Sequence, residues 1–269
     1  MSYGTLSGLK RRRKMKKNDV FYVSLTGIFS AIIVLMTVVP QLGFIFLTPL
    51  VSITLLHIPV LIGVFMMPKK YGLILGLVFG MASFIRSFTP SGPLDFAFQN
   101  PLVSVLPRVL FAFAAAYIFD FLKWVNGKGK HGDVITFLIV TAVTIFGLYY
   151  GANAISLMTG WSMGWLAPVA LVLGVAFLSL YFAFITSKDK TNVFLPSSLI
   201  LSTVVHTILV LTALSIFSTE LVDSFFPDRN VVATIFTVAA TNGLAEAVAA
   251  AVIGTPILIA LQNFKKQNV

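Results

Sequence analysis

The chain has 269 residues, of which 58% are hydrophobic and only 10% charged, and its formal net charge is +10. A soluble domain carries about a quarter charged residues, so this composition excludes an ordinary soluble enzyme and indicates a polytopic helical membrane protein. The sequence contains no cysteine, which excludes disulfides, thiolate metal sites and cysteine nucleophiles.

Repeated apolar runs predict an all-α membrane bundle of about eight transmembrane helices. The expected spans are 20–40, 49–67, 71–88, 101–123, 134–157, 165–186, 193–217 and 231–262. Residues 1–19 form a basic arm before them, and because no small-residue cleavage site follows, we expect no cleavable signal peptide.

The basic residues follow the positive-inside pattern. If the N-terminus is cytoplasmic, all but three of the 19 Lys and Arg residues fall in inner segments, the exceptions being Arg86, Arg108 and Arg229. The pattern places both termini in the cytoplasm. It also explains the net charge by topology and lipid contact rather than by nucleic-acid binding.

Small residues mark two helix-packing surfaces. Gly27 and Ala31 lie four apart in the first span, where they allow close approach of another helix. That helix belongs either to this chain or to another subunit, and composition alone favours this chain. Gly72, Gly76 and Gly80 form a longer stripe with the same spacing, which predicts a packing seam.

Ionisable side chains inside the spans are the main binding-site candidates. Arg108 is expected about six residues into its span, ~9 Å below the outer edge. Arginine at the centre of a span costs about 2.5–3.5 kcal/mol, so a partner is required. The partner is either Glu246, in a structural ion pair, or an anionic ligand. Asn242 projects from the same helical face as Glu246.

Three further positions have two interpretations each. His57 is either a packing residue or a donor to a ligand, and Arg86 either reaches the interface or joins the site. The loop 89–100, with Phe96 and Asn100, is either a lid over a cavity or an ordinary interfacial loop.

No catalytic, metal or cofactor site is expected. His57 and His206 stand alone on separate predicted helices, His206 as a packing residue, and no HExxH-type spacing is present. The sequence also contains no Walker motif, so transport would draw its energy from a partner or an ion gradient.

Three stretches resemble the substrate-binding S components of energy-coupling factor (ECF) transporters, which are prokaryotic vitamin importers. These are HIPVLIG…PKKYGLILGLVFGMASFIRSF, NPLVSVLPRVLFAFAAAYIF and TNGLAEAVAAAVIGTPI. The resemblance covers residues 20–125 and 193–262 and is greatest to the pantothenate-type group.

The resemblance implies a non-enzymatic helical protein in the prokaryotic cell membrane, with its substrate held near the outer face. It also implies a transmembrane coupling subunit, contacted by Gly27 and Ala31, and two cytosolic ATPase subunits. S components typically have six membrane helices. We therefore divide the chain into the arm 1–19, helices 1–4 in 20–125, an inserted helix pair in 126–190, and C-terminal helices with a basic tail in 191–269.

The expected function is binding of a small, anionic vitamin such as pantothenate. The alternatives are an S component for folate, cobalamin or hydroxymethylpyrimidine, an autonomous secondary transporter, and an intramembrane enzyme. An autonomous secondary transporter would be expected to contain inverted repeats, and none is detected in the sequence. The expected apolar walls are Phe44, Phe46, Phe96 and Phe98, and the expected polar groups are His57, Arg86, Asn100, Arg108, Asn242 and Glu246.

Overall fold

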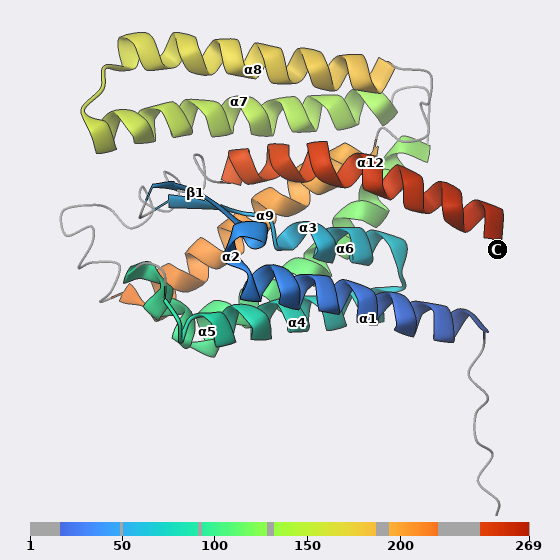
Figure 1. Ribbon diagram of the computed structural model, residues 1–269. Helices are drawn as coiled ribbons and strands as arrows, with labels where there is room; N and C mark the ends of the chain where they lie inside the picture. Colours follow the sequence, from blue (N-terminus) through green and yellow to red (C-terminus); the bar gives the residue numbers. More distant parts are fainter. Residues whose placement is uncertain are drawn as a thin grey trace, which may run out of the picture.

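The computed structural model describes residues 17–48, 51–90, 93–127, 132–186, 194–219 and 243–268 (Figure 1). The helices in these ranges are α1 (Lys17–Val38), α2 (Pro40–Gly43), α3 (His57–Met66), α4 (Lys69–Arg86), α5 (Pro101–Ser104), α6 (Leu106–Gly127), α7 (Gly132–Thr159), α8 (Met163–Thr186), α9 (Phe194–Phe217) and α12 (Leu244–Asn268). A 3-10 helix, η1 (Pro93–Gln99), and a hairpin of β1 (Phe44–Thr48) and β2 (Val51–Thr54) complete the described elements.

The predicted all-α membrane bundle is confirmed. Six helical segments of the described ranges are long and apolar enough to cross a membrane; they are α1, α5 with α6, α7, α8, α9 and α12. The 18-residue α4 and the shorter α3, which covers only part of the length of the bundle, lie among them (Figure 1).

The prediction of a single helix over 49–67 was wrong in its first part. Val51, Ile53 and Thr54 are β-branched and favour a strand, and β2 pairs antiparallel with β1, Phe44 opposite Thr54. Pro59 has no amide hydrogen and is tolerated in the first turn of a helix. Helix α3 accordingly begins only at His57.

The expected span 101–123 is confirmed, because α5 and α6 together form one apolar segment over Pro101–Gly127. The first part of the span 231–262 lies outside the described residues, and α12 is described from Leu244.

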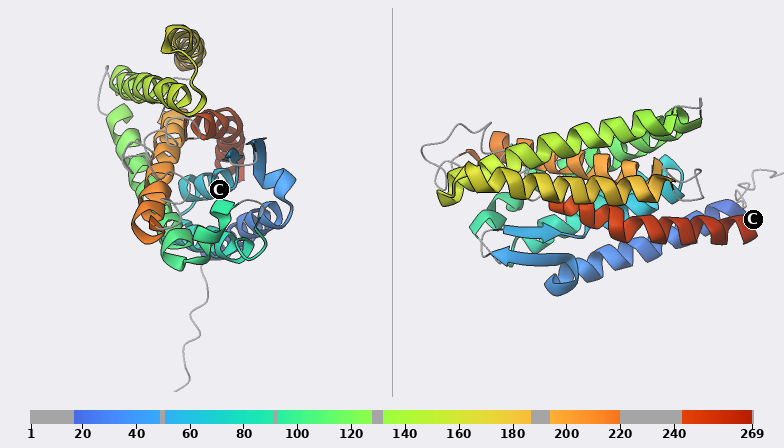
Figure 2. Two further views of the ribbon diagram at one scale, coloured as in Figure 1. Left: turned by 90° about the vertical axis from the view of Figure 1, so that its left-hand side faces the viewer. Right: turned by 90° about the horizontal axis from the view of Figure 1, so that it is seen from above.

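Helix α3 is the central element of the bundle, since every one of its ten residues is buried. The view along the bundle shows it enclosed by the other helices (Figure 2). A helix that is apolar on all sides suits this position. It packs against α4 where Gly72 lies against Val64.

The predicted glycine seam on α4 is confirmed. A Cβ placed on Gly76 would lie 2.6 Å from the Cβ of Ala112 and 2.9 Å from the carbonyl oxygen of Arg108. One placed on Gly80 would lie 2.8 Å from the Cα of Val105. The two glycines therefore let α4 approach the segment of α6 that carries Arg108.

The small residues of α1 face outward, so the interpretation that they contact another helix of this chain was wrong. A Cβ on Gly27 would meet no atom within 4 Å, and Ala31 is exposed. The neighbouring Thr26 faces inward instead, donating to the carbonyl of Tyr22 and lying 3.5 Å from the sulfur of Met67. None of the described residues covers the surface of α1 around Gly27 and Ala31.

Helices α7 and α8 pack as a pair at one edge of the bundle (Figures 1 and 2). The rings of Phe137 on α7 and Tyr181 on α8 stack with centroids 5.8 Å apart. The Tyr181 hydroxyl also shares a short hydrogen bond with the hydroxyl of Ser197 on α9. The pair is thus attached to the bundle mainly through its contacts with α9 and α6.

Candidate functional site

A cavity of about 250 Å³ lies near the end of the bundle that carries the hairpin and η1. Its wall includes residues from seven parts of the chain: α1, the hairpin, α4, η1, α6, α9 and α12. Residues far apart in the sequence thus meet around one space.

Arg108 supplies a buried cation to this cavity. Its side chain is only 6% exposed. Pro107 precedes it and has no amide hydrogen, so the carbonyl of Val103, four residues before the proline, lacks its usual helical donor. The Nη1 of Arg108 donates to that carbonyl at 2.7 Å. Pro107 therefore leaves one backbone carbonyl without a helical hydrogen bond, and the guanidinium of Arg108 is held by donating to it.

One nitrogen of the Arg108 guanidinium is left unpaired by the described part of the surrounding protein. Its Nε has no hydrogen-bond partner among the described residues. The guanidinium carbon lies 4.9 Å from the ring centroid of Phe98 and 5.7 Å from that of Phe79, so aromatic faces bound it. An unpartnered buried N–H is costly, which favours a bound acceptor here.

Glu246 supplies a carboxylate to the same cavity and is 7% exposed. The backbone amide of Thr54, at the end of β2, donates to its Oε1 at 2.8 Å. The Thr207 hydroxyl on α9 lies 3.5 Å from its Oε2. In the described part of the chain no ion pair joins Arg108 to Glu246. The predicted structural ion pair is therefore not formed, and both groups line one space.

The rim of the cavity adds a second cation and further aromatic surface. Arg86, at the end of α4, lines it and donates from Nη1 to the Thr89 hydroxyl at 2.8 Å. Phe44 and Phe98, two of the four phenylalanines predicted as walls, also line it.

Other predicted site residues lie elsewhere. Phe96 is 52% exposed and does not line the cavity. Asn100 is the N-cap of α5, with its side chain accepting from the amide of Leu102 at 3.0 Å. Asn242 and the side chain of Phe46 lie outside the described residues.

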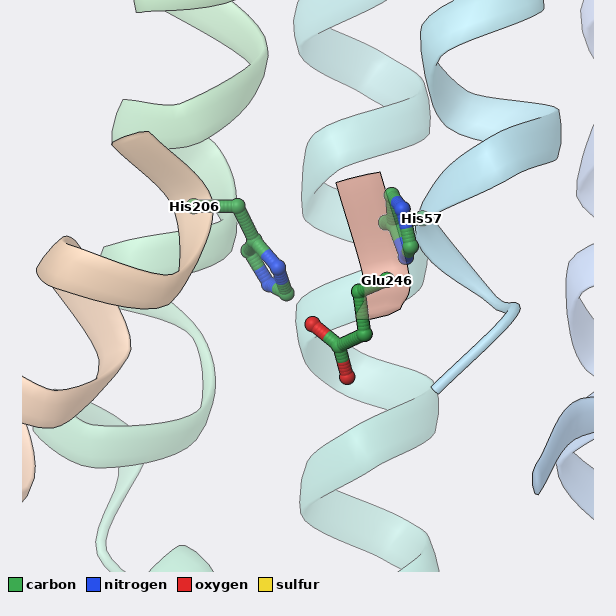
Figure 3. Close-up of side chains that lie close together, drawn as sticks. All are labelled: His57, His206 and Glu246. Atoms are coloured by element: carbon green, nitrogen blue, oxygen red, sulfur yellow. The ribbon is translucent and has the colours of Figure 1, made fainter. Parts of the chain in front are cut away.

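His57, His206 and Glu246 form a buried cluster at the side of the cavity (Figure 3). The imidazoles come from α3 and α9 and stack with centroids 5.7 Å apart. His206 lines the cavity, whereas His57 is fully buried behind it. Sequence spacing gave no sign of this cluster, because the members lie on three helices that meet only in the fold.

A membrane bundle with a small cavity that holds a buried guanidinium and a buried carboxylate has the architecture of a membrane-embedded binding protein for a polar solute. The family model for the substrate-specific component of ECF transporters matches residues 22–166, a little over half of the chain. The chain belongs to this family of transport proteins, which is not a family of enzymes.

Two relatives carry pantothenate transport in their names. The chain is 27% identical over 118 residues to the pantothenate transporter PanT of Leuconostoc mesenteroides, covering 42% of this chain and 57% of the relative. It is 26% identical over 168 residues to the pantothenic acid transporter PanT of Lactococcus lactis, covering 56% and 83%. The chain thus spans little more than half the length of the first relative.

Proposed function

We propose that this chain is the pantothenate-binding component of an ECF-type vitamin importer. The observation that carries the proposal is Arg108, a guanidinium buried in an apolar bundle whose Nε faces no protein acceptor among the described residues. In the proposed topology the chain sits in a prokaryotic plasma membrane, with its termini in the cytoplasm and the cavity toward the outside.

Pantothenate matches the chemistry of the cavity wall. The molecule carries a carboxylate at one end and two hydroxyls at the other, with an amide between them. Arg108 would bind the carboxylate through charge-assisted hydrogen bonds, each worth about 1.5–3 kcal/mol. Glu246 would accept hydrogen bonds from hydroxyls, and Phe44 and Phe98 would contact the carbon chain.

The size of the cavity supports a small vitamin. Pockets for small organic ligands measure about 300–1,000 Å³, and a cavity of about 250 Å³ lies just below that range. Folate and cobalamin are much larger than pantothenate, so the volume disfavours these two; hydroxymethylpyrimidine is small enough to fit but carries no carboxylate for Arg108.

The outward surface of α1 at Gly27 and Ala31 would meet the transmembrane coupling subunit, and two cytosolic ATPases would energise the complex. The open space beside Gly27 supports this part of the proposal, because a helix of another subunit can approach there closely. The bounds of the inserted pair, 126–190, stay a prediction.

Calorimetric titration of the purified chain with pantothenate tests the ligand and the role of Arg108 together. Arg108→Met should weaken binding by about 10- to 150-fold, which corresponds to the loss of one such charge-assisted contact. Lys123→Met, which removes an exposed cation from the same helix α6, should leave the affinity unchanged.

Pantothenol, in which an alcohol replaces the carboxylate, separates loss of charge recognition from distortion of the cavity. Its weak binding should be similar in the wild type and in Arg108→Met. If both ligands lose affinity equally in this variant, Arg108 acts through packing and the assigned carboxylate contact is incorrect.

A further inference from the structure

The cluster of His57, His206 and Glu246 contains buried nitrogen and oxygen atoms that packing alone does not account for. The three side chains are 0%, 4% and 7% exposed. Neither ring nitrogen of His206 has a hydrogen-bond partner among the described residues, and His57 has only an interaction with the backbone of Thr54 that falls short of good hydrogen-bond geometry. Buried polar atoms of native proteins are almost always paired, so imidazole nitrogens left without a well-formed hydrogen bond favour a bound ligand.

The geometry points to a metal ion. One potential ligand atom from each of the three residues lies within 4.8 Å of the others, and Figure 3 shows the side chains projecting from three different helices toward a common region. Ligand atoms around tetrahedral zinc stand about 3.4 Å apart, given bonds of about 2.1 Å. Side-chain rotations that move each atom by about one ångström would therefore close the site.

We propose that His57, His206 and Glu246 bind a divalent transition-metal ion, such as Zn²⁺, beside the substrate cavity. Two imidazoles and one carboxylate are a ligand set that zinc uses, leaving a fourth position open. Hard cations such as Ca²⁺ and Mg²⁺ prefer oxygen ligands, so the two histidines select for the borderline ions. This inference goes beyond the proposed transport function and does not depend on it.

An organic ligand in the cavity explains the cluster less completely. His206 and Glu246 line the cavity, but His57 does not. His206 is also enclosed by aromatic rings, with Phe111 at 4.6 Å and Phe79 at 5.6 Å between centroids. A single ion between the three side chains reaches His57, whereas a ligand confined to the cavity does not.

Neighbouring groups hold the carboxylate and set the charge of the site. The Thr54 amide donates to Glu246 and orients it, as outer partners of metal ligands commonly do. The Thr207 hydroxyl, which donates to the Thr203 carbonyl at 3.1 Å, lies 3.5 Å from the same carboxylate. Arg108 lines the same cavity and opposes a second cation. The negative charge of Glu246 offsets that repulsion, and an anionic ligand in the cavity would offset it further.

The test uses the full-length, tag-free protein in detergent and Co²⁺ alone as the spectroscopic probe. The wild type should bind one equivalent and show the visible absorption bands of four- or five-coordinate Co²⁺, displaced by Zn²⁺. His206→Gln and Glu246→Gln should each weaken binding by at least tenfold. His131→Gln, which changes the remaining histidine of the chain, should not.

Absence of a Co²⁺ spectrum in the wild type would overturn the proposal, as would equal binding by wild type, His206→Gln and Glu246→Gln. Because these variants can fail to fold, X-ray absorption at the zinc edge of the wild type provides a second measurement. Two imidazoles in the first shell support the site, and a shell without imidazole contradicts it. Pantothenate binding is measured in a separate titration of metal-free protein. A negative result for metal binding would therefore not affect the proposed transport function.

Discussion

At the residue scale, Pro107 and Arg108 are linked through the carbonyl of Val103, which the proline leaves without a helical donor and to which the guanidinium donates. The sequence already predicts a costly arginine inside a span, and it leaves two partners open, Glu246 and an anion. It does not reveal that the Val103 carbonyl accepts a guanidinium N–H, because this contact depends on the side-chain conformation that Arg108 adopts in the fold. No ion pair joins Arg108 to Glu246 among the described residues, and the carboxylate accepts instead from the backbone amide of Thr54.

Pro107→Ala tests this link. The new amide at position 107 can donate to the Val103 carbonyl within the helix, so it would compete with Arg108 Nη1 for that oxygen. We expect pantothenate affinity to fall by roughly 2- to 10-fold, the equivalent of about 0.5–1.5 kcal/mol for one neutral hydrogen bond. Calorimetry measures the effect. Pro101→Ala, at the start of α5, is the control, and an equal response of the two variants would refute the link.

At the element scale, the two small-residue patterns have opposite roles, which spacing alone could not distinguish. The stripe on α4 is closed against α3 and α6, whereas Gly27 and Ala31 of α1 face outward. Both patterns have the same four-residue repeat. Whether such a surface packs against a helix of the same chain or faces outward depends on where the neighbouring helices lie in the fold. The hairpin was missed for a related reason: a short apolar run with β-branched residues fits either a helix or a strand.

Gly76→Val should destabilise the bundle. The added atoms would collide with Ala112 and with the backbone of Arg108, and overpacking of this kind costs about 1–3 kcal/mol. Gly27→Val adds the same atoms where nothing lies within 4 Å. Thermal unfolding in detergent should therefore show a lower midpoint for Gly76→Val alone. A similar midpoint for the two variants would show that α4 is not closely packed at this position.

Gly27→Leu combined with Ala31→Leu should separate binding from transport. The bulky side chains project away from the described bundle, so pantothenate affinity should stay within twofold, while uptake falls at least tenfold because the coupling subunit is kept at a distance. Uptake of labelled pantothenate by cells with the complete transporter measures this. Ala167→Leu on α8 is an exposed control, and full uptake by the double variant would exclude α1 as the docking surface.

At the scale of the whole molecule, periodicity and charge predicted most of the fold, because length and hydropathy define membrane helices directly. Of the residues predicted for the site, Arg86, Arg108 and Glu246 line the cavity and Phe96 and Asn100 do not, while their part in substrate binding stays a prediction. The sequence did not single out Phe79, Thr54 and Thr207 as cavity residues. Phenylalanine and threonine are common in apolar spans, and the contact of Thr54 is made by its backbone amide, which every residue except proline has. The His57–His206 pair is purely a product of tertiary packing.

Single-cysteine labelling tests the topology, and the chain is suited to it because it has no cysteine of its own. Ser162→Cys, between α7 and α8, should react with a membrane-impermeant maleimide in intact cells. Gly127→Cys, at the opposite end of the bundle, should react only after permeabilisation, because the positive-inside pattern places it in the cytoplasm. The reverse pattern of labelling would invert the proposed orientation and turn the cavity inward.

The most direct test of the central claim is native mass spectrometry of the detergent-purified chain after incubation with an equimolar mixture of pantothenate, folate, cobalamin and hydroxymethylpyrimidine. We predict one adduct with the mass of pantothenate, strongly reduced in Arg108→Met and unchanged in Lys123→Met. An adduct with another vitamin, or a folded protein that retains none of them, would contradict the assignment of this chain as a pantothenate-binding component.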